Sequence, residues 1–181
     1  ETGYQNVAIG GLAFKHTGAN AYQCIALGYN AMTNVTGHGN VGIGTNAMEA
    51  TTSGSSNVSY GSDALGGNTT ANSNVAIGRN AQKVSTTAHS TTCVGFESGV
   101  SLTTGNDNTF IGYQAGEDAT TAFNNLLVGN RAGKNLTTGH SNVIIGHYSS
   151  GDTLTTGSQN AIIHGNVSAA DITYEHVIGP V

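Results

Sequence analysis

The residues that could do chemistry in this chain are few and far apart. Three histidines, His38, His89 and His140, are spaced at intervals of 51 residues. Histidines this far apart cannot ligate one metal ion within a single chain. Three copies of one histidine could instead meet on the axis of a symmetric trimer and hold a metal ion or an anion. The alternative is that they are solvated turn histidines, and we expect no other cofactor.

Carboxylates offer no catalytic pair. Hydrolysis of a glycosidic bond needs two carboxyl groups that face each other across a cleft, whereas Glu117 and Asp118 are the only adjacent acids and the others are scattered. No nucleophile motif, phosphate-binding loop or zinc-ligand spacing occurs. We therefore expect a protein without enzymatic activity, and a polysaccharide-degrading tailspike remains a weaker alternative.

Aromatic side chains offer a different kind of chemistry. Tyr29, Phe96, Tyr113 and the pair His147–Tyr148 each follow a recurring glycine. An exposed run of rings could stack on sugars through apolar contact and polar tips. These residues are therefore the predicted glycan-binding site. The alternative is that the rings pack on each other or on a neighbouring subunit.

A repeat positions all of these residues. One pentad, Asn-Val-Ala-Ile-Gly in its fullest form, recurs along the chain, and its glycines are spaced by 18, by 16 and then six times by 17 residues. The glycines are Gly10, Gly28, Gly44, Gly61, Gly78, Gly95, Gly112, Gly129 and Gly146. Such units are too short for helix pairs or propeller blades. They predict an all-β parallel solenoid of about ten 17-residue coils.

The repeat also sets the expected domain boundaries. Residues 4–165 carry the solenoid, residues 1–3 are expected to be a processing remnant, and residues 166–181 are expected to form a degenerate last coil or a cap. Each coil is expected to contain a strand, a glycine bend, a second short strand and a turn. Paired threonines with glycine, as in Thr103-Thr104-Gly105, indicate the turn.

Alternation along a strand assigns side chains to faces. Residues three and one places before the glycine, such as Val41 and Ile43, are expected to face the coil interior with a small residue such as Ala47. The glycine is expected to take a positive φ or to allow close backbone contact. The leading asparagines are expected either to form a ladder from coil to coil or simply to favour turns.

The central strand position is then expected to face outward, although it is apolar. Strands that are apolar on both faces are buried on both faces, so another chain would have to cover this column. Its members are small in the first half of the chain and large in the second. The sequence therefore predicts self-association, with Cys93, Phe110, Leu127 and Ile144 in the oligomer interface.

Composition excludes several classes of partner. The net charge is −5 with only five Lys and Arg residues. This argues against nucleic-acid binding, because neutralising phosphate groups requires clustered basic side chains. No apolar run approaches the length of a membrane span, so we expect no membrane insertion. Cys24 and Cys93 lie four coils apart, too far for a disulfide.

The pentad followed by two residues and a small one resembles the head repeats of trimeric autotransporter adhesins. The longer unit, as in residues 108–116, is similar to repeats of bacteriophage tail fibres. The resemblance spans residues 4–165, although the 17-residue unit is longer than the usual adhesin-head repeat. It implies a left-handed β-roll assembled as a homotrimer. It also implies an extracellular place on a virion tail or bacterial cell surface, and attachment to a host surface receptor, with a glycan as one candidate.

A second functional class is an ice-binding β-solenoid. Paired threonines keep the 17-residue spacing from Thr69 onward, and a regular threonine face suits ice. Adjacent residues of a strand, however, point to opposite faces. We therefore expect a structural and receptor-binding module first and an ice-binding protein second.

Overall fold

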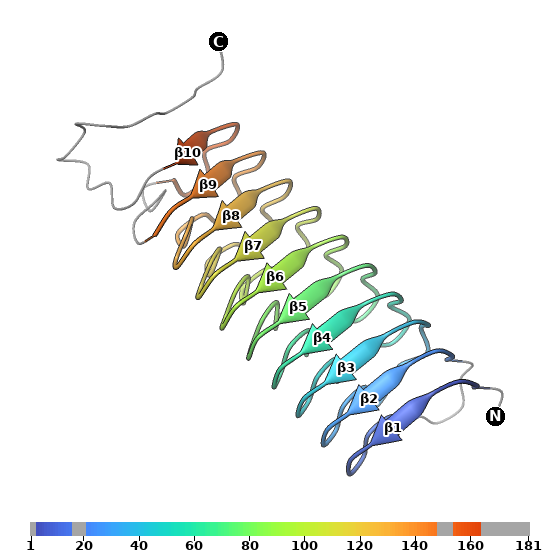
Figure 1. Cartoon of the computed structure of the whole chain (residues 1–181). Coiled ribbons are helices and arrows are strands. Elements are labelled where there is room, and N and C mark those ends of the chain that lie inside the picture. The colour runs from blue at the N-terminus through green and yellow to red at the C-terminus, as the bar shows by residue number, and fades with distance from the viewer. Residues whose placement is uncertain (1–2, 16–20, 148–153, 164–181) are drawn as a thin grey trace.

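The chain folds as a parallel β-solenoid, seen in a computed structural model that describes residues 3–15, 21–147 and 154–163 (Figure 1). Ten strands, one in each coil, stack in chain order in a single sheet. They are β1 Val7–Ile9, β2 Ile25–Leu27, β3 Val41–Ile43, β4 Val58–Tyr60, β5 Val75–Ile77, β6 Thr92–Val94, β7 Thr109–Ile111, β8 Leu126–Val128, β9 Val143–Ile145 and β10 Ala161–Ile163. The predicted all-β solenoid is confirmed.

Hydrogen bonds between successive coils hold the stack together. Each strand pairs in parallel with the next and the pentads align, so that Val58 lies beside Val75. Outside the strands the backbone continues the same pattern, for example from the N–H of Met48 to the carbonyl of Ala64 at 3.0 Å. The predicted second strand is a run of turns instead. In the described residues we find no helix, and hence none that could cross a membrane.

The glycine at the end of each strand makes the bend, as predicted. Gly61 has a φ of 144°, and a Cβ atom placed on it would lie 2.5 Å from the carbonyl oxygen of Gly78 in the next coil. Non-glycine residues also take positive φ at three recurring positions, represented in one coil by Ser56, Asp63 and Leu65. The coil therefore turns through many left-handed residues, which the glycine pattern did not predict.

The core contradicts the predicted orientation of the strands. The central residue of each inner strand is buried, and Phe110 has no exposed surface, whereas its neighbour Ile111 is 39% exposed. Cys93, Phe110, Leu127 and Ile144 therefore lie inside their own chain and cannot form the predicted oligomer interface. Alternation separates the two faces of a strand but does not say which face is inside.

Two interior columns explain the change from small to large central residues. In the early coils, large side chains four places after the bend fill the core, and in the later coils glycines replace them. These residues are Met32, Met48, Leu65 and Gln82, followed by Gly99, Gly116 and Gly133. A Cβ on Gly42 would lie 2.7 Å from Met32 Cγ, and one on Gly116 would lie 2.8 Å from the Phe110 ring. Large residues of one column thus lie against small residues of the other, within a coil or between neighbouring coils, which keeps the core close-packed.

The asparagine column forms the ladder that was one of the two predicted alternatives. Asn57 donates from Nδ2 to the Asn40 side-chain oxygen at 3.1 Å and to the carbonyl of Ala71 at 2.8 Å. Its own Oδ1 accepts the backbone N–H of Asn74 at 3.0 Å. Because these amides are buried, each must be paired to avoid a desolvation cost. The ladder therefore fixes the position where each strand begins.

Candidate functional site

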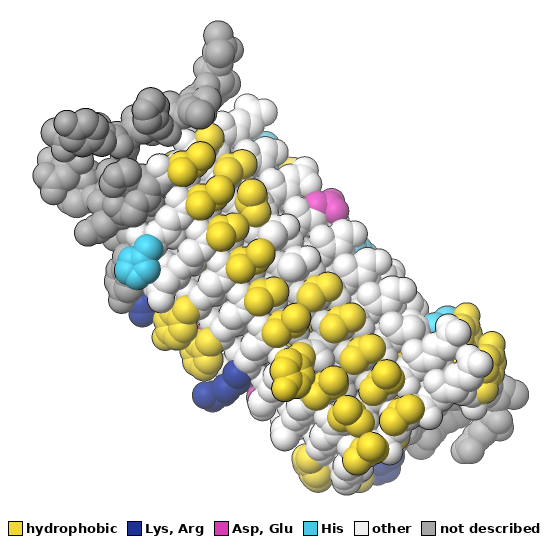
Figure 2. Space-filling view, viewed as in Figure 1, with side chains coloured by type: hydrophobic (Ala, Val, Ile, Leu, Met, Phe, Trp, Pro, Cys, Tyr) yellow, Lys and Arg dark blue, Asp and Glu magenta, His cyan; other side chains and the backbone are white. Residues whose placement is uncertain are grey.

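The outer face of the strands is an uncharged surface, which we call the strand face. It carries the first and third side chain of every strand in two parallel columns (Figure 2). The first column is Val7, Ile25, Val41, Val58, Val75, Thr92, Thr109, Leu126, Val143 and Ala161. The second is Ile9, Leu27, Ile43, Tyr60, Ile77, Val94, Ile111, Val128, Ile145 and Ile163. Neither column contains a charged residue, so an uncharged and mostly apolar stripe follows the solenoid axis.

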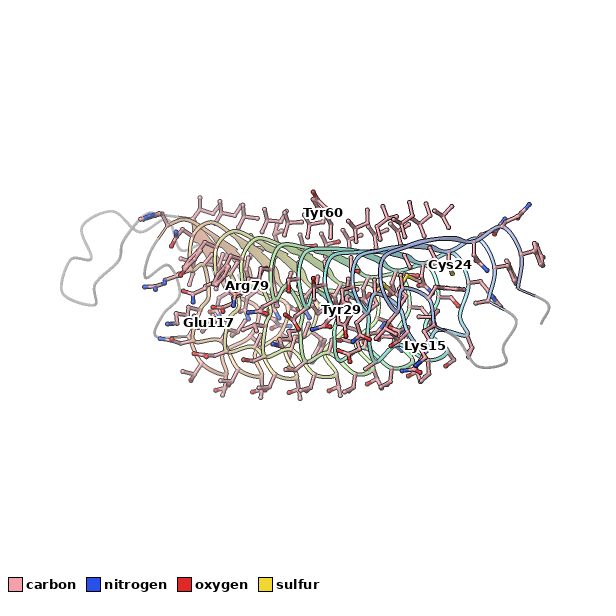
Figure 3. All side chains as sticks on the ribbon, turned by 90° about the horizontal axis from the view of Figure 1, so that it is seen from below. Lys15, Cys24, Tyr29, Tyr60, Arg79 and Glu117 are labelled. Atoms are coloured by element: carbon pink, nitrogen blue, oxygen red, sulfur yellow. The ribbon has the colours of Figure 1, made fainter. Side chains whose placement is uncertain are left out.

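Three residues interrupt the aliphatic character of the strand face. Tyr60 is 59% exposed and rises above its neighbours (Figure 3). Thr92 and Thr109 are register partners in adjacent strands, and one apolar row of Figure 2 is broken in its middle. These three positions were not singled out by the sequence, although aligning the pentads in columns would have shown them as exceptions.

Charged side chains gather on a different side of the coil, formed by the residues that follow the bend glycine. We call this side the charged edge. All five basic residues of the chain and all but one of the described carboxylates lie there. They are Lys15, Arg79, Lys83, Arg131 and Lys134 with Glu49, Asp63, Glu97, Glu117 and Asp118. Since the two signs balance, this edge keeps the surface hydrated without a strong field of one sign.

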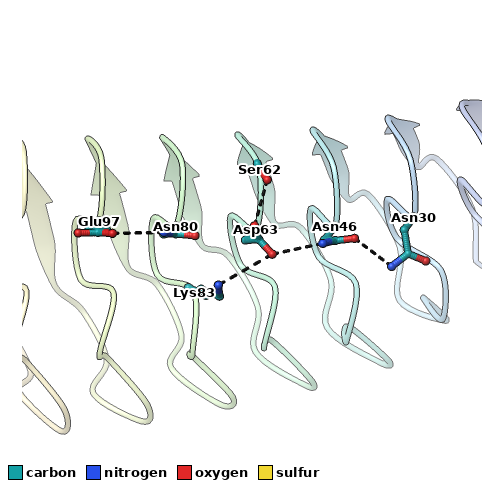
Figure 4. Close-up of polar contacts among 7 residues, drawn as sticks. All are labelled: Asn30, Asn46, Ser62, Asp63, Asn80, Lys83 and Glu97. Atoms are coloured by element: carbon teal, nitrogen blue, oxygen red, sulfur yellow. Dashed lines mark hydrogen bonds and ion pairs between the residues drawn. The ribbon is translucent and has the colours of Figure 1, made fainter.

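A ladder of polar side chains runs along the charged edge (Figure 4). Asn46 donates to Asp63 at 3.4 Å, and Ser62 donates to the other oxygen of the same carboxylate at 3.0 Å. Further along, Asn80 donates to Glu97 at 3.3 Å. The bonds from Asn46 and Asn80 join successive coils, so Asp63 and Glu97 take part in holding the stack together.

The predicted aromatic shelf exists in part. Phe96 and Tyr113 stack with ring centroids 5.3 Å apart. The guanidinium groups of Arg79 and Arg131 lie over the outer ring faces, at 5.7 and 5.8 Å from the centroids. The ring faces are therefore covered by each other and by two cations, and only ring edges and the arginines meet solvent. The two arginines were missed because nothing in one repeat alone indicates them.

The other predicted glycan-binding residues are not brought to this stack. Tyr29 lies on the second coil, is 57% exposed and has small residues on both sides in its column. His147 lies on the ninth coil, and Tyr148 falls outside the described residues. The prediction thus divides into one covered stack and two separate aromatic positions.

The three histidines lie in one column before the strands, where they support neighbouring coils. His38 stacks on Tyr22 at 3.7 Å, and His140 stacks on Phe123 at 4.6 Å. The Nδ1 atom of His89 accepts the backbone N–H of Asn72 at 3.0 Å. No three His, Cys, Asp or Glu side chains of the described residues gather as metal ligands. An ion on an assembly axis stays a prediction.

The two cysteines are buried and free, in line with the prediction that they do not pair. Burial raises the pKa of the Cys93 thiol from 9.0 to about 12. Burial also raises the pKa of Cys24, against hydrogen bonds from Asn40 and Gly39 that lower it. Neither thiol is suited to nucleophilic chemistry near neutral pH.

The paired threonines form a regular column at the turn. Thr103 donates from Oγ1 to the carbonyl of Thr120 at 2.9 Å, and Thr120 donates likewise to Thr137 at 3.2 Å. The second residue of each pair, such as Thr104, is exposed. Thr103 is half-buried whereas Thr104 is exposed, and the predicted opposite orientation of the two side chains stays a prediction. One hydroxyl of each pair therefore serves the stack and the other meets solvent.

One notch of about 370 Å³ opens on the charged edge. It lies where Gly66 and Gly67 leave one coil without side chains, and Glu49, Asp63 and Lys83 are among its lining residues. Lys83 lies 4.0 Å from the Asp63 carboxylate. Two carboxylates, Glu49 and Asp63, thus line the notch together with Lys83.

Comparison with known proteins gives no indication of function. No protein-family model, no curated protein and no solved structure matches this chain. The functional argument therefore rests on the geometry of the strand face and the charged edge, together with the resemblance of the repeat.

Proposed function

We propose that this chain is a non-enzymatic structural and receptor-binding module of an extracellular fibre, on a virion tail or a bacterial cell surface. It works as a homotrimer of left-handed β-rolls and needs no cofactor. The observation that carries the proposal is the uncharged strand face, which is exposed along the solenoid. A contiguous apolar surface of this kind marks an interaction site.

The period of the strand face favours a second copy of the same chain as the partner. Its side chains recur once per coil, at the ~4.8 Å spacing of parallel strands. A partner that contacts every coil must carry the same period, and another copy does so automatically. Closed symmetry is the usual arrangement of such copies. The choice of three copies rests on the resemblance to trimeric adhesin heads.

Attachment is assigned to the charged edge. Tyr29 and Arg79 lie away from Tyr60 of the strand face (Figure 3), so the charged edge stays in solvent when strand faces meet. Arginine and the edges of aromatic rings bind the hydroxyl and acidic groups of surface glycans. This edge supplies both, so we assign the receptor contact to it.

Molar mass in solution tests the assembly. Light scattering of the full chain should give three times 18.2 kDa, with the same value after a chelator is added. A monomer at micromolar concentration would contradict the proposal. Binding to immobilised surface glycans, compared between the wild type and Tyr29→Ala, tests the attachment separately.

Ice binding is the second candidate, and the threonine column favours it. Thr70, Thr87, Thr104, Thr121 and Thr138 recur at the coil spacing and are exposed. Half of the paired hydroxyls are already bonded to the backbone, which leaves a single row instead of a two-dimensional array. Absence of thermal hysteresis would exclude this function, and its presence together with a monomeric mass would favour it over the fibre module.

A further inference from the structure

The uniformity of the strand face creates a problem of register. A copy shifted by one coil presents nearly the same valines and isoleucines again, since the period of the side chains equals one coil. Apolar contacts alone therefore set the strength of association but specify alignment weakly. If copies assemble through this face, as proposed above, something else has to align them.

The three interrupting residues have the properties that alignment requires. Tyr60 places a bulky ring with a polar tip in a column of aliphatic residues, and Thr92 and Thr109 place two hydroxyls in the other column. Among the described residues, none of these hydroxyls has a hydrogen-bond partner within the chain. Each would need a partner once an interface covers it, because a buried hydroxyl without a hydrogen bond is destabilising.

We infer that Tyr60, Thr92 and Thr109 fix the assembled copies in a parallel, unshifted alignment. In that alignment each threonine meets its own counterpart, and the hydroxyls can bond across the interface. The Tyr60 rings also meet at one level. The inference rests on the proposed self-association, and the residues act as a buried polar residue does when it fixes the register of a coiled coil.

Other alignments lose some of these contacts. A shift by one coil toward the C-terminus keeps Thr92 against Thr109, but it places Thr109 against Leu126 and Tyr60 against Ile77. A reversed alignment can place Thr92 of one copy opposite Thr109 of the other. It then places β4, which carries Tyr60, opposite β9, which carries only Val143 and Ile145 on this face. No reversed alignment therefore matches all three levels. Only the parallel, unshifted arrangement pairs every polar group.

Cysteine cross-linking of the full chain tests the alignment. Single variants Ile25→Cys, Thr109→Cys and Val143→Cys place a thiol at three levels of the strand face. We expect all three to form disulfide-linked copies on mild oxidation, while Thr104→Cys on the turn does not. The native cysteines are buried and should stay silent. A reversed alignment would link at most one of the three variants and would overturn the inference.

A second variant isolates the three residues from the rest of the face. Tyr60→Ile, Thr92→Val and Thr109→Val together should keep the molar mass of the assembly. Ile25→Cys and Val41→Cys are then each added to this triple variant, and the two chains are mixed and oxidised. Disulfides between the new thiols at positions 25 and 41, which lie in neighbouring coils, should rise from a trace to the frequency of disulfides between identical positions. If the alignment stays unshifted, the inference fails while the proposed assembly stands. A monomeric wild type would instead remove the proposed assembly itself.

Discussion

At the scale of single residues, the bend glycines are the least replaceable positions of the chain. Gly61 combines a φ of 144° with a backbone oxygen 2.5 Å from where its Cβ would lie. Gly39 has a φ of 64°, but its Cβ would meet only the Ser56 hydroxyl, at 3.9 Å. Later coils place Ser56 and Ser73 at the position of Gly39, also with positive φ. The two kinds of glycine are therefore distinguishable by substitution.

We expect Gly61→Ala to lower the free energy of unfolding by about 3 kcal/mol or more. The alanine would have both a strained backbone conformation and a clash between its Cβ and the next coil. Gly39→Ser should stay within about 0.5 kcal/mol of the wild type. Denaturant unfolding followed by circular dichroism measures both. Equal effects of the two substitutions would contradict the role of the bend.

The Cys93 thiol gives a pH-dependent prediction. Its pKa is raised from 9.0 to about 12 by burial, so the folded state holds the proton more tightly than the unfolded state does. This contribution to stability is complete below pH 9 and is lost as the pH rises through 12. We expect the free energy of unfolding to fall between these values.

The free energy of unfolding of Cys93→Ala should fall less steeply over the same pH range, which assigns the difference between the two chains to the thiol. A thiol reagent at pH 8 should label neither cysteine in the folded chain and both after unfolding. Rapid labelling of the folded chain would show that the core is more open than the structure indicates.

At the scale of elements, the core is a set of matched pairs. A large residue on the strand is accommodated by a glycine in the facing turns, as with Phe110 and Gly116. The reverse pairing occurs with Gly42 and Met32. The change in size along the central strand column is thus compensated inside the solenoid core, within a coil or between neighbouring coils, and it does not indicate a taper of an interface.

Phe110→Ala should lower the free energy of unfolding by about 3–5 kcal/mol, because it leaves a cavity in a closed core. Adding Gly116→Met should recover part of this loss, since methionine fills the equivalent place in the early coils and tolerates the same positive φ there. Thermal unfolding of the two variants checks the compensation. Gly116→Met alone should be destabilising, because the new side chain collides with the Phe110 ring.

At the scale of the whole molecule, the solenoid separates its surfaces by chemistry. One side is apolar and uncharged, one carries nearly all the described charges, and one carries threonine hydroxyls. Such a division leaves the apolar side for association and the charged side for solvent and ligands. Assembly should therefore respond to substitutions on one side only.

Ile111→Asp on the strand face should reduce the molar mass from three chains toward one, because an interface would have to bury an unpaired carboxylate. Thr104→Asp on the turn is the matched control and should leave the mass unchanged. Light scattering at equal concentration measures both variants. The same loss of mass in both would point to misfolding, and no loss in either would place the interface elsewhere.

The sequence by itself determined the repeat and most of its internal bonding. The spacing of the glycines set the coil length. The leading asparagines allowed either turns or the ladder now seen from Asn40 to Asn74 and from Asn108 to Asn160. The neighbourhood of Phe96 and Tyr113 followed from the same spacing. These features depend only on the period, because stacked coils bring equivalent residues together whatever the shape of one coil.

Only the tertiary structure decided which strand face lies inside. Alternation is symmetric, so Phe110 and Ile111 were both candidates for the core, and apolar character could not separate them. The choice depends on what lies opposite, and the facing turns leave room for one large residue in each coil. For the same reason Tyr60, Thr92 and Thr109 gained meaning only when their columns were known to face outward.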